Sequence, residues 1–205
     1  MKKTNNKGFS LVELIIVIAI MAILAGAIAP ALIKYIDKSR KSNDVSSAKT
    51  IKTAIETALG TEEVYETLTN NSGGTTVIKF VSNAPVTAGG TSSFNTSYMT
   101  VTGCSNPNTN PAMTNDEICK SIASNIGEKI PKTKYKKMID NTGTKVDSNG
   151  FTPDTFYAFI TSGGTVYVAV GDSSKTVSYT PASGSAAAQF GNCAPLAPEV
   201  CKGYQ

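Results

Sequence analysis

The stretch Leu14 to Ile33 reads LIIVIAIMAILAGAIAPALI and holds no charged residue over its 20 positions. At about 1.5 Å per residue, a helix of this length spans the ~30 Å hydrocarbon core of a bilayer. The run is apolar on every side, whereas a surface helix of a globular domain keeps a polar face. We therefore predict a helix that lies among lipids or among other apolar helices.

A conventional secretory signal peptide is the alternative for this segment, and it would make the chain a soluble exported binding protein. Lys2, Lys3 and Lys7 would form its basic region, and Ala25-Gly26-Ala27 looks like its cleavage site. The run is long for such a peptide, however, and Glu13 stands at its start. A carboxylate costs about 2.5–3.5 kcal/mol near a membrane centre and less near the interface. We therefore expect Glu13 to have a partner that compensates its charge, or a functional role.

The residues at this junction, Lys7-Gly8-Phe9-Ser10-Leu11-Val12-Glu13-Leu14, lead directly into the apolar run. The segment resembles the class III signal of type IV prepilins and pseudopilins, strongly over about residues 7–35 and only in general layout beyond. The resemblance implies that a prepilin peptidase cuts between Gly8 and Phe9. It also implies that the same enzyme methylates the new amine of Phe9.

Charge gives Phe9 and Glu13 a joint role in assembly. After cleavage the Phe9 amine is cationic, and the anionic Glu13 follows four residues later. Neither charge is stable alone in a low-dielectric helix bundle. We expect Glu13 of one subunit to pair with the Phe9 amine of its neighbour, which would also set the axial register. The alternative is that Glu13 reaches the lipid headgroups.

Two residues mark a soft point in the apolar helix. Pro30 has no N–H, so the carbonyl of Gly26 loses its helical partner. Gly26 itself has a low helix propensity. The resemblance implies unwinding of Gly26–Pro30 in some assembled filaments, and a mild kink is the alternative.

The same resemblance implies partners and a location. The partners are copies of the chain itself, an inner-membrane assembly platform and a cytoplasmic ATPase. The protein would be a single-pass plasma-membrane protein before assembly and part of an extracellular pilus afterwards, serving adhesion, motility or DNA uptake. A pseudopilin of a type II secretion or competence system has the same N-terminus. The long C-terminal part with its cysteines favours a pilin.

The predicted fold class is α+β, a long N-terminal helix carrying a head of antiparallel sheet. We divide the chain into a leader (1–8), a helix (9–60, apolar over 9–33) and a globular head (61–205). Past the apolar run, a stripe recurs at helical spacing and should cover the sheet; its members are Ala48, Ile51, Ile55, Ala58 and Leu59. Gly60 is a natural stop for the helix.

The head should contain short helices and strands joined by turns. A helix is predicted to open near 61–65, and a second to run from a capping box at Thr114 to Pro131. Strands are predicted at 75–81 and 97–101. A three-stranded meander is predicted from 156–160, 166–170 and 175–179.

The four cysteines have no C-x-x-C spacing, and histidine is absent, so a zinc set is not expected. In an exported chain an even count suggests two disulfides, with three possible pairings. We favour the local one, Cys104–Cys119 with Cys193–Cys201.

Catalysis is not expected, because the chain lacks the usual general base, and neither a cofactor nor a metal is expected. Asp140 and Asp147 resemble half a calcium loop, but Ala158 stands where its last carboxylate would be. The net charge of +4 reflects the leader: without its three lysines, 16 basic and 15 acidic residues nearly cancel. A run of lysines could contact nucleic acid, but a solvated loop is the interpretation we favour; these are Lys129, Lys132, Lys134, Lys136 and Lys137.

Overall fold

A computed structural model of the chain describes residues 8–70, 74–80, 99–102, 115–127, 130–183 and 187–205. The chain divides into two compact units, residues 1–39 and residues 40–205. Helix α1 (Leu11–Ala58) begins in the first unit and ends in the second. Each unit is described separately below.

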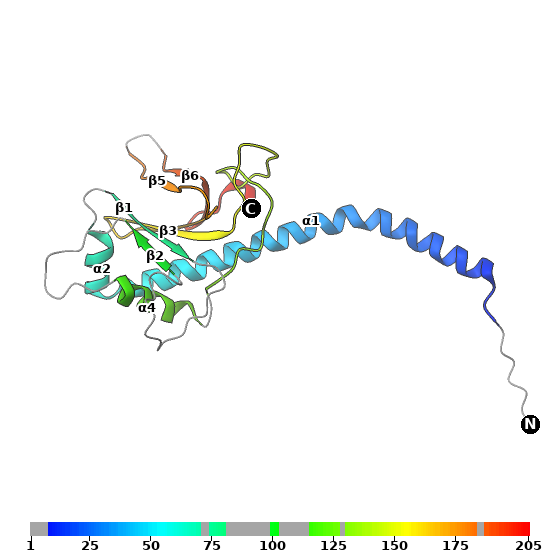
Figure 1. The fold of residues 1–205 in the computed structure, drawn as a ribbon, viewed down its shortest axis with the longest axis horizontal. Helices are drawn as coiled ribbons and strands as arrows, with labels where there is room; N and C mark the ends of the chain where they lie inside the picture. The colour runs from blue at the N-terminus through cyan, green and yellow to red at the C-terminus, as the bar shows by residue number, and fades with distance from the viewer. Residues whose placement is uncertain (1–7, 71–73, 81–98, 103–114, 128–129, 184–186) are drawn as a thin grey trace, which may run out of the picture. The chain divides into compact units, whose positions relative to one another are not determined.

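The second unit is α+β, as predicted, and is built around a five-stranded antiparallel sheet (Figure 1). Its strand order is β2-β1-β3-β4-β7. A separate two-stranded sheet pairs β5 with β6. The strands are β1 (Thr75–Phe80), β2 (Met99–Thr102), β3 (Thr155–Thr161), β4 (Val166–Gly171), β5 (Ser178–Thr180), β6 (Gln189–Gly191) and β7 (Cys193–Ala197). The other helices are α2 (Glu62–Thr69), α4 (Asn115–Ile126) and the 3-10 turn η1 (Lys202–Tyr204).

The C-terminal half of α1 lies against one face of the sheet and forms the main core with it. The predicted stripe is confirmed at four positions: Ala48, Ile51 and Ile55 are fully buried, and Ala58 is 2% exposed. Leu59, its fifth predicted member, follows the last residue of α1 and is half-buried against the same core. The four buried residues share a cluster with the sheet residues Ile78, Phe80, Phe156, Ala158, Ile160 and Val168. These sheet residues share one face because side chains alternate along a strand, as the pairings of Ile78 with Ala158 and of Ala158 with Val168 require.

The opposite face of the sheet carries a smaller aromatic cluster. Phe159 is its buried centre, and the rings of Tyr167, Tyr179 and Phe190 pack around it. Tyr179 lies 5.0 Å from both Tyr167 and Phe190, measured between ring centroids. Tyr179 is on β5 and Phe190 is on β6, so the two-stranded sheet covers this face with aromatic side chains.

The prediction that the segment at 175–179 is the third strand of the meander, beside β4, is wrong. β3 and β4 form the expected hairpin, but the neighbour of β4 on its other side is β7. The segment at Ser178–Thr180 pairs with β6 instead. Burial explains the choice, since four of the five residues of β7 are buried while the residues of β5 are exposed or half-buried. As the last strand of the sheet, β7 also tolerates Pro195, which has no N–H to donate.

The helix that starts near Thr114 ends earlier than predicted. α4 stops at Ile126, and Gly127 follows with a φ of 109°, a left-handed conformation that favours glycine. The end signal is therefore Gly127 rather than Pro131. Thr114 lies outside the described residues, as does the first part of the strand predicted at 97–101.

Asp44 ties α1 to the segment that follows α4. Its side chain is fully buried, and it accepts backbone N–H bonds from Lys134 (2.6 Å) and Tyr135 (3.0 Å). Burial raises the pKa of this carboxyl, while the two N–H groups and Lys136 partly oppose the rise. The extended segment 131–137 is therefore held to the helix at two consecutive amides.

The C-terminal turn is attached to the same end of the core. The ammonium group of Lys41 donates to the carbonyl of Gly203 and lies 4.6 Å from the ring centroid of Tyr135. Gly203 also donates its N–H to the carbonyl of Thr142. A Cβ at Gly203 would lie 2.0 Å from backbone atoms of Gly143, so only glycine allows this approach.

Asp44 predicts a pH dependence of stability. Because its pKa is raised in the folded chain above the ordinary 3.8, its contribution is fully present at lower pH and is lost as pH rises through the folded pKa. Asp44→Asn cannot ionise and lacks this loss. Unfolding of the full chain in detergent, followed by near-ultraviolet circular dichroism, should therefore show the wild type losing free energy of unfolding relative to Asp44→Asn as pH rises above about 4. A difference that is constant over that range would contradict the assignment.

Candidate assembly site

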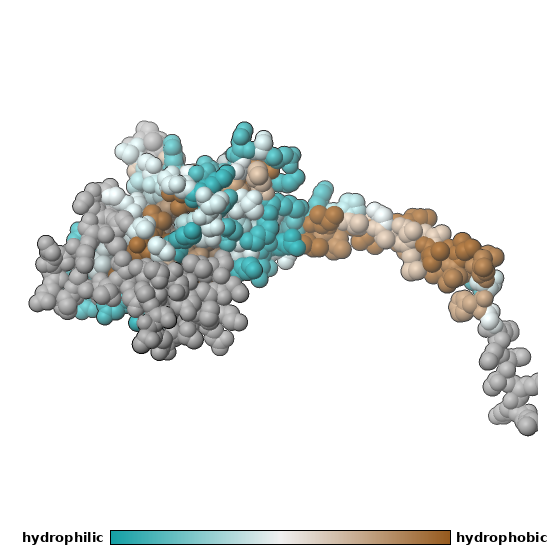
Figure 2. Space-filling view, viewed as in Figure 1, coloured by the Kyte–Doolittle hydropathy of each residue, from teal (hydrophilic) through white to brown (hydrophobic). Residues whose placement is uncertain are grey.

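The first half of α1 exposes its apolar side chains on all sides. Every large hydrophobic residue from Phe9 to Ile36 is at least 41% exposed, and Figure 2 shows apolar colouring over this half of the helix. This half of the helix is strongly apolar, and none of its most apolar stretch is buried within the chain. By length and composition this helix could cross a membrane.

So much exposed apolar area needs a partner. Fully burying one Leu, Ile, Val or Phe side chain contributes about 1.5–3 kcal/mol. Contiguous apolar patches of this size mark membrane or protein contacts. The first unit therefore offers an interaction surface that surrounds the helix, with Glu13 as an acidic group in its first turn.

Glu13 caps the start of its own helix. Its Oε2 accepts the backbone N–H of Ser10 at 2.9 Å, and the carbonyl of Ser10 accepts the N–H of Leu14. Ser10 to Glu13 therefore has one half of a capping box, in which the third helical residue reaches back to the N-cap amide. The pattern S-x-x-E was present in the sequence but overlooked there. A single N–H bond leaves the carboxylate with further acceptor positions for a second donor.

The junction before the helix is open. Phe9 is 87% exposed, and Gly8 is also exposed. A Cβ built at Gly8 would meet no atom within 4 Å, so nothing in the described chain requires glycine there. A requirement for glycine would then come from whatever binds this segment.

Gly26 and Pro30 both lie inside α1, which runs without interruption from Leu11 to Ala58. A Cβ built at Gly26 would also meet no atom within 4 Å. The soft point between them stays a prediction for the assembled state.

The predicted bond between Cys193 and Cys201 is not formed in the structure, and both side chains are free thiols. The two residues belong to opposite faces of the sheet. Cys193 is buried in the aromatic cluster with Phe159, whereas Cys201 packs against the main core that includes α1. Burial raises the pKa of Cys193 to about 12 and that of Cys201 to about 11. Cys104 lies outside the described residues, so its pairing with the buried Cys119 stays a prediction.

The lysine run divides into groups with different surroundings. Lys132 and Lys134 are exposed and alternate with the buried Thr133 and Tyr135. The ammonium of Lys136 instead donates to Thr133 Oγ1 at 2.7 Å and to the carbonyl of Pro153 at 3.3 Å. Lys136 therefore has a structural role, and Lys129 lies outside the described residues.

The two acids of the predicted half calcium loop are engaged locally. Asp140 Oδ1 accepts the backbone N–H groups of Thr142 and Thr144, and the hydroxyl of Thr142 also lowers its pKa. Asp147 lies 3.3 Å from the ammonium of Lys145. In the described part of the chain, no three metal-ligating side chains come together.

Comparison with known proteins agrees with the junction and the helix. A family model for the prokaryotic N-terminal methylation motif matches residues 3–29. The type IV major fimbrial protein FimA of Dichelobacter nodosus is 46% identical over 57 residues, which are 28% of this chain and 36% of FimA. The type IV major pilin protein PilA of Myxococcus xanthus is 35% identical over 69 residues, which are 34% of this chain and 31% of PilA.

One relative matches over more of its length. The fimbrial protein EcpC of Eikenella corrodens is 34% identical over 105 residues, which are 50% of this chain and 69% of EcpC. By contrast, the chain spans only about a third of the length of the FimA relatives that it matches. No solved structure matches.

The long apolar helix and the motif at its start define the class of proteins whose N-terminal helix begins at a methylation motif. An antiparallel sheet packed on the second half of that helix is the pilin arrangement within this class. With the match to EcpC, the chain belongs to the type IV pilin family.

The thiols lead to a prediction about alkylation. Native chain in detergent, treated with iodoacetamide near neutral pH, should leave Cys193 unmodified, because the thiol is buried and its raised pKa keeps it protonated. Denaturant should make Cys193 and Cys201 both reactive without a reductant. Mass mapping identifies each site, and Cys193→Ser serves as the control. A Cys193–Cys201 peptide found without reduction would contradict the thiol assignment.

Proposed function

We propose that the chain is the structural subunit of an extracellular type IV pilus. It is made as a membrane-anchored precursor, cut between Gly8 and Phe9, methylated at Phe9 and polymerised through its N-terminal helix. The observation that carries this proposal is the apolar helix exposed on all sides, with an acid in its first turn and a methylation motif matched at its start. The pilin relatives support the same role.

Charge compensation explains how such a helix joins a bundle. Taking an unpaired carboxylate out of water costs several kcal/mol, and removing one partner of a buried pair costs about 3–5 kcal/mol. Glu13 already accepts the N–H of Ser10, but that bond leaves its negative charge uncompensated. The ammonium of a neighbour's Phe9 supplies the missing charge and a strong hydrogen bond.

This pairing gives an apolar bundle its axial register. Apolar side chains are interchangeable along a helix surface, so burial alone does not select one axial offset. Each subunit brings one cation at Phe9 and one anion at Glu13. The offset that joins them is the one with no buried unpaired charge.

The proposal includes partners that act before the filament exists. A prepilin peptidase removes the leader and methylates Phe9, while an inner-membrane platform and a cytoplasmic ATPase move subunits from the plasma membrane into the growing filament. The head then forms the outer surface of an extracellular pilus. Adhesion, motility and DNA uptake all remain compatible with a subunit of this kind.

Glu13 gives the first test of assembly. Glu13→Ala should remain in the membrane fraction but reduce sheared filaments to less than about a tenth of wild type, since the neighbour's amine loses its counter-ion at a cost of several kcal/mol. Glu13→Gln is the matched control, because it keeps an acceptor for the Ser10 N–H but removes the charge. It should fail as Glu13→Ala does. Normal filaments from Glu13→Gln would show that only the helix cap matters.

The mature N-terminus gives the second test. Mass spectrometry of filaments, or of the membrane-bound subunit, should identify N-methylated Phe9 as the first residue. Substituting Gly8 by Val should leave the uncut precursor in the membrane, because the peptidase has to approach the backbone closely. A mature chain that began after Ala27 would instead identify a conventional signal peptide and overturn the proposal.

A further inference from the structure

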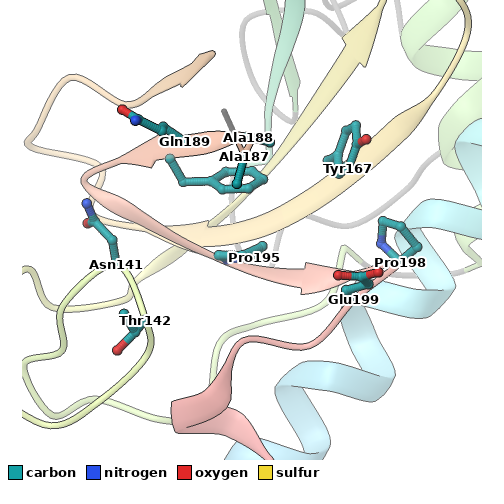
Figure 3. A pocket seen from close by; sticks show the side chains of 10 residues that line it. Asn141, Thr142, Tyr167, Ala187, Ala188, Gln189, Pro195, Pro198 and Glu199 are labelled. Atoms are coloured by element: carbon teal, nitrogen blue, oxygen red, sulfur yellow. The ribbon is translucent and has the colours of Figure 1, made fainter. Parts of the chain in front are cut away.

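A trough of about 620 Å³ lies over the sheet face that carries the aromatic cluster (Figure 3). Tyr167 on β4 and Phe190 on β6 supply its rings, and Pro195 and Pro198 supply rigid apolar walls. The centroids of the two rings are 6.2 Å apart and their planes are inclined by 66°. The trough therefore presents ring surface in two directions.

The charge of the trough selects the kind of group that it accepts. Glu199 is the single charged residue lining it, and the remaining polar lining is uncharged. Glu199 is exposed and has no ion pair or side-chain hydrogen bond within the described residues. A trough lined by one carboxylate and by aromatic rings favours a cation, since ring faces carry the negative part of the quadrupole. An anion would meet no compensating charge there.

The same chain carries suitable cations at another place on the second unit. Lys132 and Lys134 are exposed, and within the described residues neither ammonium group forms an ion pair or a hydrogen bond, although Lys134 interacts electrostatically with Asp44. Their backbone is held in place, because Lys134 donates its N–H to the buried Asp44. A lysine has an apolar stem and a charged end, which suit a trough with apolar walls and one carboxylate.

The two surfaces lie on different parts of the head. The trough lies over the sheet face that carries the aromatic cluster. Tyr135, the buried neighbour of Lys134, belongs instead to the core cluster that includes α1. A contact between two different patches is heterologous, and a repeated heterologous contact that does not close generates an open helical polymer. This is the symmetry that a homopolymeric filament requires.

We propose that, in the filament, Lys132 or Lys134 of one copy enters the trough of a neighbouring copy and lies against Glu199, Tyr167 and Phe190. The inference rests on the proposed pilus function and adds to it a contact between heads. The contact is electrostatic and partly exposed, so it should weaken as ionic strength rises.

Charge reversal tests this contact from both sides. Glu199→Lys alone, or Lys132→Glu with Lys134→Glu, places like charges opposite each other at every head contact. Each set should lower the yield of sheared filaments about tenfold. Combining all three substitutions restores opposite charges and should return the yield to within about twofold of wild type. Lys145→Glu is the control, because it reverses one lysine charge at an exposed residue outside the trough.

A second measurement on wild-type filaments does not depend on any variant folding. A carbodiimide joins a carboxylate to an amine in contact with it, forming an amide with loss of water. Mass spectrometry should find Glu199 joined to Lys132 or Lys134. Circular dichroism of each variant in detergent checks that the head is folded.

Two outcomes overturn the proposal. One is wild-type filament yield from either reversal set together with no cross-link. The other is folded single-set variants that lose filaments while the combined variant does not recover, which would mean that the trough takes a cation from elsewhere. Failure of the pilus function itself looks different, because wild-type cells would then yield no filaments at all.

Discussion

The carboxylate of Glu13 needs hydrogen-bond donors or a counter-charge in any environment that the first half of α1 occupies. In the isolated chain it accepts the N–H of Ser10 at the start of the helix. That bond orders the first turn, but it leaves a full negative charge beside a segment whose large side chains are apolar and exposed. Any surroundings that bury those side chains also remove water from the carboxylate. The apolar surface can therefore be buried only where the acid gains a partner.

Helix α1 carries two sequence patterns with opposite consequences. Before Ile36 the apolar residues surround the helix, and no single face can hold them against one globular partner. From Ala48 to Ala58 they form a stripe that is buried under the sheet. The fully buried Asp44 stands where the stripe begins, and it binds two backbone amides instead of adding apolar contact. One continuous helix can therefore serve two environments because its pattern changes along its length.

Local patterns predicted the parts of the fold that depend on neighbouring residues. The helix, its buried stripe and the β3–β4 hairpin follow from periodicity and turn chemistry, and all of them are present. The partner of β4 was not predictable in this way. It depends on how two later segments compete for a buried edge. β7 resembled irregular chain because it contains Pro195 and is followed by Pro198. The predicted Cys193–Cys201 bond is absent for a related reason: spacing says nothing about which face of a sheet each side chain occupies.

The candidate site could be proposed from the sequence because its residues lie within six positions of one another, and its role in assembly stays a prediction. Phe9 and Glu13 stand out from an uncharged background. The role of Ser10 was also readable, since S-x-x-E is a capping pattern, but the cleavage junction drew attention to other residues. The anchoring of the lysine segment could not be predicted, because Asp44 and Lys134 are 90 residues apart in the chain.

A bundle of such helices raises a question of driving force. Lipid tails are about as apolar as leucine, so burying apolar area does not by itself move a helix from a membrane into a filament. Close packing has to contribute, and the run of small residues around Gly26 lets helix backbones approach one another. Polar contacts then have to provide direction, because packing of similar apolar surfaces selects no single offset. In the proposed filament the charged groups set the arrangement: Glu13 with Phe9 within the bundle, and the proposed lysine–trough contact between heads. The apolar residues supply most of the buried area.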